Sequence, residues 1–432
     1  MSHDQLLISC HCGAARQTVM RSAQSGPSDA NLCHCYACRH STGLLCISYV
    51  SIQPPLSLSG LVSHTDETTR TSIATLHRYF CETCGCHVFR RWTPLFSSEA
   101  KDEDAEVEVW EVATGIIVGL AEVRQAADER NEEWKPLLKF AGHVNTASTR
   151  DGGLSSFLSH IETYRFEVRG DQGAPSITPL LAAQQESDIQ GAGGNDVLEA
   201  HCYCKAIRFH ITRPDASSRL PHSGFPDLTI PFATSPRELI ANPHDEKWWL
   251  LPPGHANPSK YLAGTCACRS CRLTSGFEIQ TWAFVPRSNI FFFPPASPPS
   301  HPPPSISLSP SPAPAATPKP IPLDFATLRN QGVPLKTYDS SPGVQREFCA
   351  RCGATVFWHD RWRPDLADVS VGLLDAPEGA RAESWLEWWC GRVSFEEEAG
   401  NGRTGEVARM AKGLVGSLAE GLRRWEGERA GG

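Results

Sequence analysis

The feature that most constrains this chain is a set of cysteine motifs that occurs twice in the same order. Each set begins with C-x-C, continues with C-x-C-x-x-C-R and ends with an aromatic residue followed by C-x-x-C-G. The first set supplies Cys10, Cys12, Cys33, Cys35, Cys38, Cys81 and Cys84. The second supplies Cys202, Cys204, Cys266, Cys268, Cys271, Cys349 and Cys352. A duplication is the simplest account of such a long-period repeat, so we expect two homologous domains in tandem.

Composition narrows the class of protein. The 432 residues are enough for two or three domains with cores of their own. The net charge of −8 offers no basic surface for nucleic acid, and the longest apolar runs are too short to span a bilayer. The first residues contain neither the basic nor the apolar stretch of a secretory signal. Because many of the seventeen cysteines have C-x-C and C-x-x-C spacings, we expect metal thiolates in a reducing compartment, the cytoplasm.

The repeat and the composition together predict the domain boundaries. We expect a first zinc-binding domain at residues 1–169, a Gly-, Gln-, Ala- and Ser-rich linker at 170–196, and a second domain at 197–400. The second domain carries an insert at 294–322, where 13 of 29 residues are proline, too many for a sheet or a helix. In the tail, 401–432, apolar residues recur at three- or four-residue steps from Val407 to Trp425, which predicts a docking helix.

Short β-prone runs separated by turn residues predict a mainly β fold. Residues 5–19 are expected to be a strand that carries Cys10 and Cys12, with 197–211 as the counterpart, and 44–52 and 107–118 as further strands. Residues 76–89 predict a strand, a turn and a second strand, in which Gly85 suits positive φ. The acidic run at 99–108 is expected to be a solvated loop.

The C-x-C and C-x-x-C pairs can meet in one four-thiolate site in each domain. The first quartet would be Cys10, Cys12, Cys81 and Cys84, and the second Cys202, Cys204, Cys349 and Cys352. Such closed sites hold structural zinc, whose binding free energy contributes directly to folding. The alternative is a redox role for C-x-x-C, which would leave the other cysteines without a purpose.

The two triples predict a different kind of zinc site. They are Cys33, Cys35 and Cys38 in the first half, and Cys266, Cys268 and Cys271 in the second. Three protein ligands leave the fourth position open, as in catalytic zinc sites. A thiol entering that position would be deprotonated by the metal, and could then add to, or leave, a carbonyl carbon. We therefore expect up to four zinc ions per chain, two of them at catalytic sites.

Several residues near the motifs have weaker indications. His34 and His40 flank the first triple but correspond to Ala267 and Leu273 in the second, so we treat them as incidental. Of the remaining cysteines, Cys46 is expected in the core, Cys86 is either a core thiol or an alternative zinc ligand, and Cys390 has no informative spacing.

The motifs resemble those of the glutathione-dependent formaldehyde-activating enzyme family, which also includes centromere protein V. The matching stretches in the first half are 10–13, 33–43 and 80–85. In the second half they are 202–204, 266–276 and 348–353. Residues 143–158 are similar to the end of a fungal-type copy. One departure is Lys205, which stands where the family motif has glycine.

The resemblance implies two packed antiparallel β-sheets in each domain, a β-tent-like fold around the structural zinc. It also implies a carbon–sulfur lyase of the S-(hydroxymethyl)glutathione synthase type, in which the three-cysteine zinc is the catalytic or glutathione-linked one. The expected partners are a small thiol, such as glutathione, and an aldehyde, with no nucleic acid and no membrane. The alternative function is a non-catalytic, zinc-stabilised protein-interaction module, as centromere protein V suggests.

Overall fold

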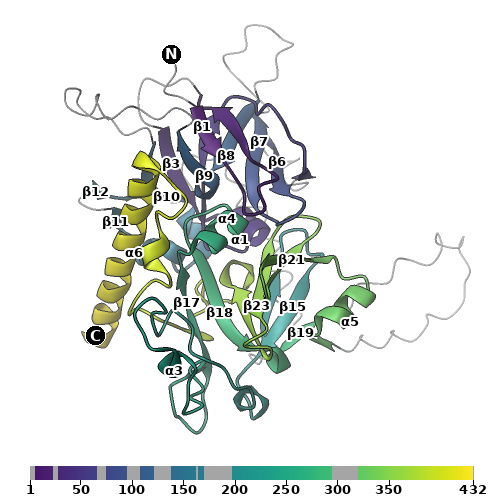
Figure 1. Cartoon of the computed structure of the whole chain (residues 1–432), viewed down its shortest axis with the longest axis vertical. Coiled ribbons are helices and arrows are strands. Elements are labelled where there is room, and N and C mark those ends of the chain that lie inside the picture. The colour runs from purple at the N-terminus through teal and green to yellow at the C-terminus, as the bar shows by residue number, and fades with distance from the viewer. Residues whose placement is uncertain are drawn as a thin grey trace, which may run out of the picture.

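The computed structural model describes residues 5–22, 28–65, 74–94, 108–120, 138–161, 164–169, 197–293 and 320–431. The expected linker at 170–196, nearly all of the acidic run at 99–108 and most of the proline-rich insert lie outside these residues. Figure 1 shows two β-rich lobes, one from each half of the chain. The helix α6 (Gly405–Gly431) runs along one side of both lobes, and the short helices α1 (Tyr36–Thr42) and α4 (Arg269–Ser275) lie where the lobes meet. The mainly β prediction and the C-terminal helix are confirmed.

The described residues of the first half form two sheets and a small ribbon. The smaller sheet has the order β2-β1-β9, with β1 (Gln5–Ile8), β2 (Gln17–Met20) and β9 (Ile117–Leu120). The larger has the order β13-β10-β3-β4-β8-β7-β6-β5. Its strands are β3 (Ser28–Cys33), β4 (Ile47–Ile52), β5 (Leu61–Thr65), β6 (Ala74–Cys81), β7 (His87–Pro94), β8 (Val109–Ala113), β10 (Leu138–Val144) and β13 (Glu167–Arg169). The ribbon pairs β11 (His160–Ile161) with β12 (Tyr164–Arg165).

The second half repeats this plan with additions. A four-stranded sheet has the order β14-β15-β19-β20, formed by β14 (Val197–His201), β15 (Arg208–Thr212), β19 (Ile290–Phe292) and β20 (Ile321–Pro322). The larger sheet has the order β16-β17-β18-β24-β23-β22-β21, and β25 (Leu386–Trp388) pairs with β17. Its strands are β16 (Leu250–Leu251), β17 (Lys260–Cys266), β18 (Gln280–Pro286), β21 (Leu335–Ser341), β22 (Val344–Cys349), β23 (Thr355–Asp360) and β24 (Leu366–Ser370). Two further short helices are α3 (Arg237–Ile240) and α5 (Phe325–Asn330).

The structure differs from the prediction in two hairpins, one divided strand and the direction of some strand pairs. Residues 5–19 and 197–211 are hairpins, β1–β2 and β14–β15, because the cysteine pair of each lies in a tight turn. Gly13 in the first turn has a φ of 85°, and Lys205 adopts the same left-handed region with a φ of 55°, so the turn survives the loss of glycine. The predicted strand at 107–118 is divided into β8 and β9 by a 3-10 turn. The sheets are mixed, because β10 runs parallel to β3 and β25 parallel to β17.

The last two residues of the expected proline-rich insert belong to a strand. Ile321 and Pro322 form β20, which pairs with β19 in the register Phe292 to Ile321. A proline at the edge of a sheet is tolerated, since its missing N–H removes no bond from the interior of the sheet. The strand–turn–strand at 76–89 is confirmed as β6 and β7, and Gly85 has the predicted positive φ, 74°.

A large hydrophobic cluster runs through both halves, and a small second cluster contains Cys266, Cys271 and Trp282. The large cluster includes buried residues from Leu6 in β1 to Leu422 in α6. Glycines permit the close approach of the halves: a Cβ on Gly43 would lie 2.2 Å from the carbonyl oxygen of Thr355. On α6, Leu414, Leu418 and Leu422 are buried, as expected for a docking helix. None of the helices in the described ranges combines the length and the apolar character needed to cross a membrane.

Candidate metal centres

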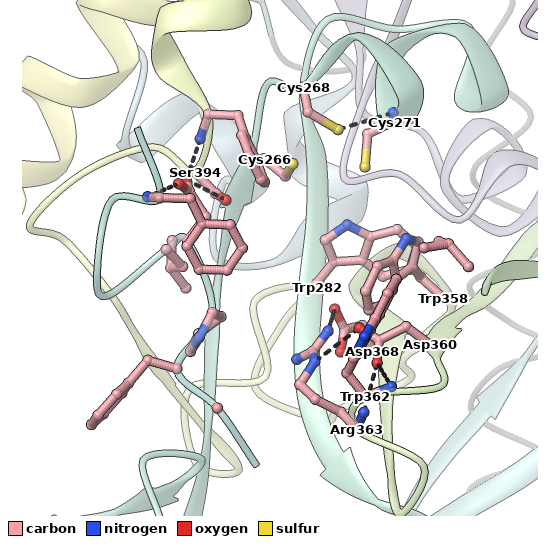
Figure 2. Close-up of a pocket in the computed structure, with 18 of the residues that line it drawn as sticks. Cys266, Cys268, Cys271, Trp282, Trp358, Asp360, Trp362, Arg363, Asp368 and Ser394 are labelled. Atoms are coloured by element: carbon pink, nitrogen blue, oxygen red, sulfur yellow. Dashed lines mark hydrogen bonds and ion pairs between the residues drawn. The ribbon is translucent and has the colours of Figure 1, made fainter. Parts of the chain in front are cut away.

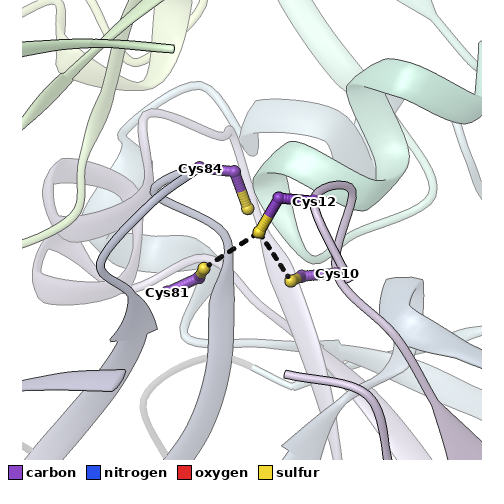
Figure 3. Close-up of side chains that lie close together, drawn as sticks. All are labelled: Cys10, Cys12, Cys81 and Cys84. Carbon is purple, nitrogen blue, oxygen red and sulfur yellow. Dashed lines mark hydrogen bonds between the residues drawn. The ribbon is translucent and has the colours of Figure 1, made fainter. Parts of the chain in front are cut away.

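The first four-cysteine group is assembled by two hairpins. Figure 3 shows Cys10 and Cys12, from the turn after β1, facing Cys81, at the end of β6, and Cys84, in the turn before β7. The four sulfur atoms lie within 4.8 Å of one another, and that of Cys12 is 3.5 Å from Cys10 and 3.4 Å from Cys81. Four sulfurs at about 2.3 Å from a tetrahedral zinc would be about 3.8 Å apart. The quartet therefore fits such an ion.

The second quartet has the same construction. Cys202, Cys204, Cys349 and Cys352 place their sulfurs within 4.8 Å of one another. In both halves the first cysteine accepts a backbone hydrogen bond from the residue five positions later. The N–H of Ala15 lies 3.4 Å from Cys10 Sγ, and the N–H of Ile207 lies 3.4 Å from Cys202 Sγ. Backbone donors of this kind stabilise thiolates, which are the form that binds metal.

Each three-cysteine group sits at the start of a short helix. Cys35 caps α1, with its sulfur 3.4 Å from the N–H of Cys38, and Cys268 caps α4 with a corresponding distance of 3.2 Å to Cys271. The first cysteine of each group ends the preceding strand, β3 or β17. The sulfurs of each group lie within 4.8 Å of one another, so each set can hold a metal ion with a position left for another ligand.

Two buried arginines, which the cysteine motifs did not predict as part of the sites, lie beside the three-cysteine groups. Arg78 and Arg346 are buried, three positions before the C-x-x-C motif of their half. Arg346 Nη2 lies 3.4 Å from Cys271 Sγ, and Arg78 Nη2 lies 3.9 Å from Cys38 Sγ. Hydrogen bonds from Cys266 and Cys268, with the charge of Arg346, hold the pKa of Cys271 well below the usual thiol value. Alignment of the two halves would have exposed this repeated arginine.

The first open site has a polar surrounding. Asn145, directly after β10, donates from Nδ2 to Cys33 Sγ at 3.3 Å. Arg90 on β7 forms a bidentate pair with Glu111 on β8, and its guanidinium lies 4.3 Å from the centroid of the Tyr49 ring. With Arg78, these groups surround the triple with amide, guanidinium and phenol groups.

The second open site lies in a cavity of about 830 Å³. Trp282 packs against Cys266 and Cys271, and Figure 2 shows Trp282 and Trp358 between the cysteines and an Arg363–Asp368 pair. Arg363 Nη2 lies 3.3 Å from Asp368 Oδ2. Burial raises the pKa of Asp368 to about 7 in spite of that arginine. No motif marks this carboxyl group, because its neighbourhood depends on the tertiary fold.

Each half supports the open site of the other. The N–H of His11, in the first quartet turn, donates to the carbonyl of Leu273 in α4 at 3.0 Å. Reciprocally, the N–H of Tyr203, in the second quartet turn, donates to the carbonyl of His40 in α1 at 2.9 Å. The arginine that ends each triple motif also crosses. Arg39 Nη1 is 3.4 Å from the carbonyl oxygen of Gly372, and Arg272 Nη1 is 2.6 Å from that of Gly115.

The remaining candidates from the sequence lie in the packing around these groups. His34 Nε2 is 2.8 Å from His143 Nδ1, and His40 stacks on His201 at 4.5 Å between ring centroids. Cys46, Cys86 and Cys390 are buried and lie outside the four cysteine groups of the described residues.

Comparison with known families bears on the first half. No curated protein and no solved structure matched the chain. The family model described as glutathione-dependent formaldehyde-activating enzyme matches residues 5–118, a range that includes the first quartet and the first triple. Residues 5–118 therefore form one domain of that family.

Proposed function

We propose that this protein is a zinc-dependent carbon–sulfur lyase that joins a small thiol to an aldehyde at its three-cysteine sites. The observation that carries the proposal is the open cysteine triple within the family domain at 5–118. The family description points to glutathione and formaldehyde as the reactants.

We also infer that residues 197–395 are a second copy of the domain, so that the chain has two open sites. The same motif order supports this, as do the matching helix caps at Cys35 and Cys268. The reciprocal hydrogen bonds of His11 and Tyr203 are those expected between two copies related by an approximate two-fold axis. Four zinc ions per chain follow, two at the quartets and two at the triples.

The quartets would hold structural zinc, and the triples would hold the reactive ions. Zinc at a triple would supply a soft Lewis acid that lowers the pKa of a thiol and keeps it as thiolate. The protein supplies the charge balance, because three thiolates and a divalent cation carry a net negative charge. The guanidinium groups of Arg78 and Arg346 offset that charge at Cys38 and Cys271.

The second site also contains a group that can exchange a proton. Adding a thiol to a carbonyl forms an S–C bond while the C=O π bond breaks, and the oxygen must gain a proton. The Asp368 carboxyl lines the cavity and has a pKa of about 7, so it can hold or release a proton near neutral pH. In the first half, Glu111 on β8 occupies the matching position and pairs with Arg90.

A reducing compartment suits this assignment, because disulfide formation would remove the metal ligands. We place the protein in the cytoplasm on this ground, with a small thiol and an aldehyde as its partners. All seventeen cysteines are free thiols, and fourteen of them lie in the four groups.

The test combines metal analysis with turnover. Reduced, purified protein should contain zinc, and adduct formation from glutathione and ¹³C-formaldehyde, followed by NMR, should run faster than without protein. The double variant Cys35→Ser with Cys268→Ser should keep the quartet zinc and lose turnover. Zinc content without any acceleration would favour the second candidate, an interaction module, for which the exposed Trp362 and Phe232 at the second cavity offer a contact surface.

A further inference from the structure

The cavity over the second triple is larger than a one-carbon aldehyde requires. Its volume of about 830 Å³ is in the range that drug-sized ligands occupy. The cysteines lie at one end of it, while Trp362 and Phe232, 58% and 43% exposed, line it at the surface. In a formaldehyde adduct the aldehyde part is a single carbon, so only the thiol part of that adduct could contact the aromatic lining.

Three positions show how the lining differs from the first site. Trp282 in β18 stands where β4 has Tyr49, since the two pair with the matching residues Ser370 and Ala113. Likewise Trp358, opposite Asp368, stands where Arg90 lies opposite Glu111. The third position comes directly after the residue that pairs in parallel with the first cysteine of the triple, Val144 with Cys33 and Ser394 with Cys266. The backbone at this position has positive φ in both halves. The residue there is Asn145 in the first half and Phe395 in the second.

Another wall of the second cavity comes from a segment that has no counterpart in the first half. Between the C-x-C motif and the triple, the second half runs from position 204 to 266, while the first half runs only from 12 to 33. This longer segment contributes Phe225, Leu228 and Phe232 to the cavity. The first half has too few residues there to build a comparable wall.

The aromatic wall is held in place by a buried carboxylate. Asp227, 2% exposed, accepts hydrogen bonds from the N–H of Phe232 at 2.8 Å and the N–H of Phe395 at 2.6 Å. It also accepts from Ser394 Oγ at 3.1 Å. Two aromatic residues from distant parts of the chain are thereby fixed on the same side of the cavity, so the space between them and Trp282 is a built feature of the fold.

The polar groups of the cavity include an anchor beside the cysteines. Arg363 is paired with Asp360 and Asp368 at 3.3 Å each. Arg346 is 3% exposed, and its Nε and Nη1 have no hydrogen-bond partner among the described residues. A ligand with an oxygen near Cys271 and an apolar group farther out would satisfy both ends of the cavity.

We propose that the second open site takes the adduct of a thiol with an aldehyde that carries an aromatic ring or a similarly bulky apolar group. This rests on the proposed function, whose reaction it keeps. The sulfur bonds to the carbonyl carbon, the C=O π bond breaks and the thiol proton passes to the oxygen, with no oxidant or reductant. Arg346 would donate to that oxygen, and the apolar group would lie among Trp282, Trp358 and Phe395.

The test measures binding of two stable probes, S-benzylglutathione and S-methylglutathione, to the zinc-loaded full-length protein by calorimetry. Burial of the phenyl ring should make the benzyl probe bind about tenfold more tightly or better. The double variant Phe232→Ala with Trp362→Ala should lose most of that preference, and both residues are exposed enough that the fold should tolerate the change. The control Leu239→Ala, 47% exposed in α3 and outside the cavity lining, should retain it.

Equal affinity for the two probes in the unmodified protein would overturn this proposal, as would a preference that the double variant retains. Turnover is scored separately, with glutathione and either formaldehyde or benzaldehyde. Acceleration with formaldehyde but no benzyl preference would leave the lyase function standing and end this inference. A benzyl preference without turnover of either aldehyde would end the lyase function and keep the ligand class.

Discussion

The two three-cysteine sites have the same backbone arrangement but different side chains around it. In both, a strand delivers the first cysteine, a helix cap delivers the second, and a buried arginine approaches the third. Around the first, Asn145 and Arg90 provide polar contacts, whereas Phe395 and Trp358 occupy those positions in the second. The backbone that brings the three sulfurs together is therefore the same in both sites, while the side chains around it differ, so one can vary while the other is kept.

The largest effect is expected from substitutions in the two quartets, which should stabilise their halves to a similar degree. Cys81→Ser and Cys349→Ser should each lower the unfolding free energy by several kcal/mol, because metal binding at a closed quartet contributes directly to folding. Cys35→Ser and Cys268→Ser should cost far less, since the triples are more open. Thermal melting with zinc analysis measures both pairs. Similar destabilisation by all four changes would refute the division into structural and open sites.

Acid should distinguish the halves next. The first half buries four histidines, His34, His40, His87 and His143. In the second half, the positions that match His34, His40 and His87 are Ala267, Leu273 and Thr355. Burial lowers the pKa of His87 and of His143 to about 4, from an ordinary value of 6.5. As pH falls from 6.5 to 4, the unfolded chain takes up protons that the folded chain excludes. Each such histidine should therefore cost roughly 3 kcal/mol of stability by pH 4.

Hydrogen exchange as a function of pH would measure this asymmetry, with the first half losing protection before the second. The control is His87→Thr, which introduces the residue of the second half and should reduce the acid-dependent loss. Because thiolate protonation releases metal from both halves, only the difference between the halves is diagnostic. Simultaneous loss in both, unchanged by His87→Thr, would contradict the role of the buried histidines.

Arg39 and Arg272, which reach from each triple to the other half, should contribute unequally to the stability of the protein. Arg272 is 1% exposed and donates to the carbonyls of Gly115 at 2.6 Å and Asn401 at 2.9 Å, while Arg39 has one longer contact, 3.4 Å, to Gly372. Arg272→Ala should cost about 2–4 kcal/mol, and Arg39→Ala about half as much. Denaturant unfolding would measure both. A larger cost for Arg39→Ala would show that these hydrogen bonds do not govern the contact between the halves.

The cysteine motifs predicted the composition of all four groups because ligand spacing is local in sequence. Cys10 and Cys81 are distant, yet Cys10 lies in the turn after β1 and Cys81 directly precedes a turn, and both turns are recognisable from nearby residues. The contacts between the halves could not be predicted in this way. The approach of Gly43 to Thr355 and the carboxyl environment of Asp368 depend on how sheets from different parts of the chain pack.

The hairpins at 5–19 and 197–211 show a more local limit of prediction. The β-prone residues on both sides of Cys10 or Cys202 favour strand, and the pattern cannot reveal where the chain reverses. The left-handed conformation of Lys205 illustrates this limit, because tertiary packing and the turn bond from its N–H to the carbonyl of Cys202, 2.9 Å, override the preference of lysine.

The smallest effect is expected from deleting one of the two segments that make the second half longer than the first. One of them, between positions 204 and 266, builds a cavity wall, whereas the other, 294–319, is a proline-dense stretch between β19 and β20. Because β19 and β20 pair directly, with Phe292 opposite Ile321, a short Asn-Gly-containing turn can replace 294–319. Shortening the loop reduces its closure entropy by about 0.6 kcal/mol for each halving of length, so the melting temperature should stay level or rise slightly. Retained probe affinities at the second cavity would serve as the control, since neither β19 nor β20 lines it. A fall of several degrees in melting temperature would show that the proline-rich stretch contributes to the fold, and would make both extra lengths structural.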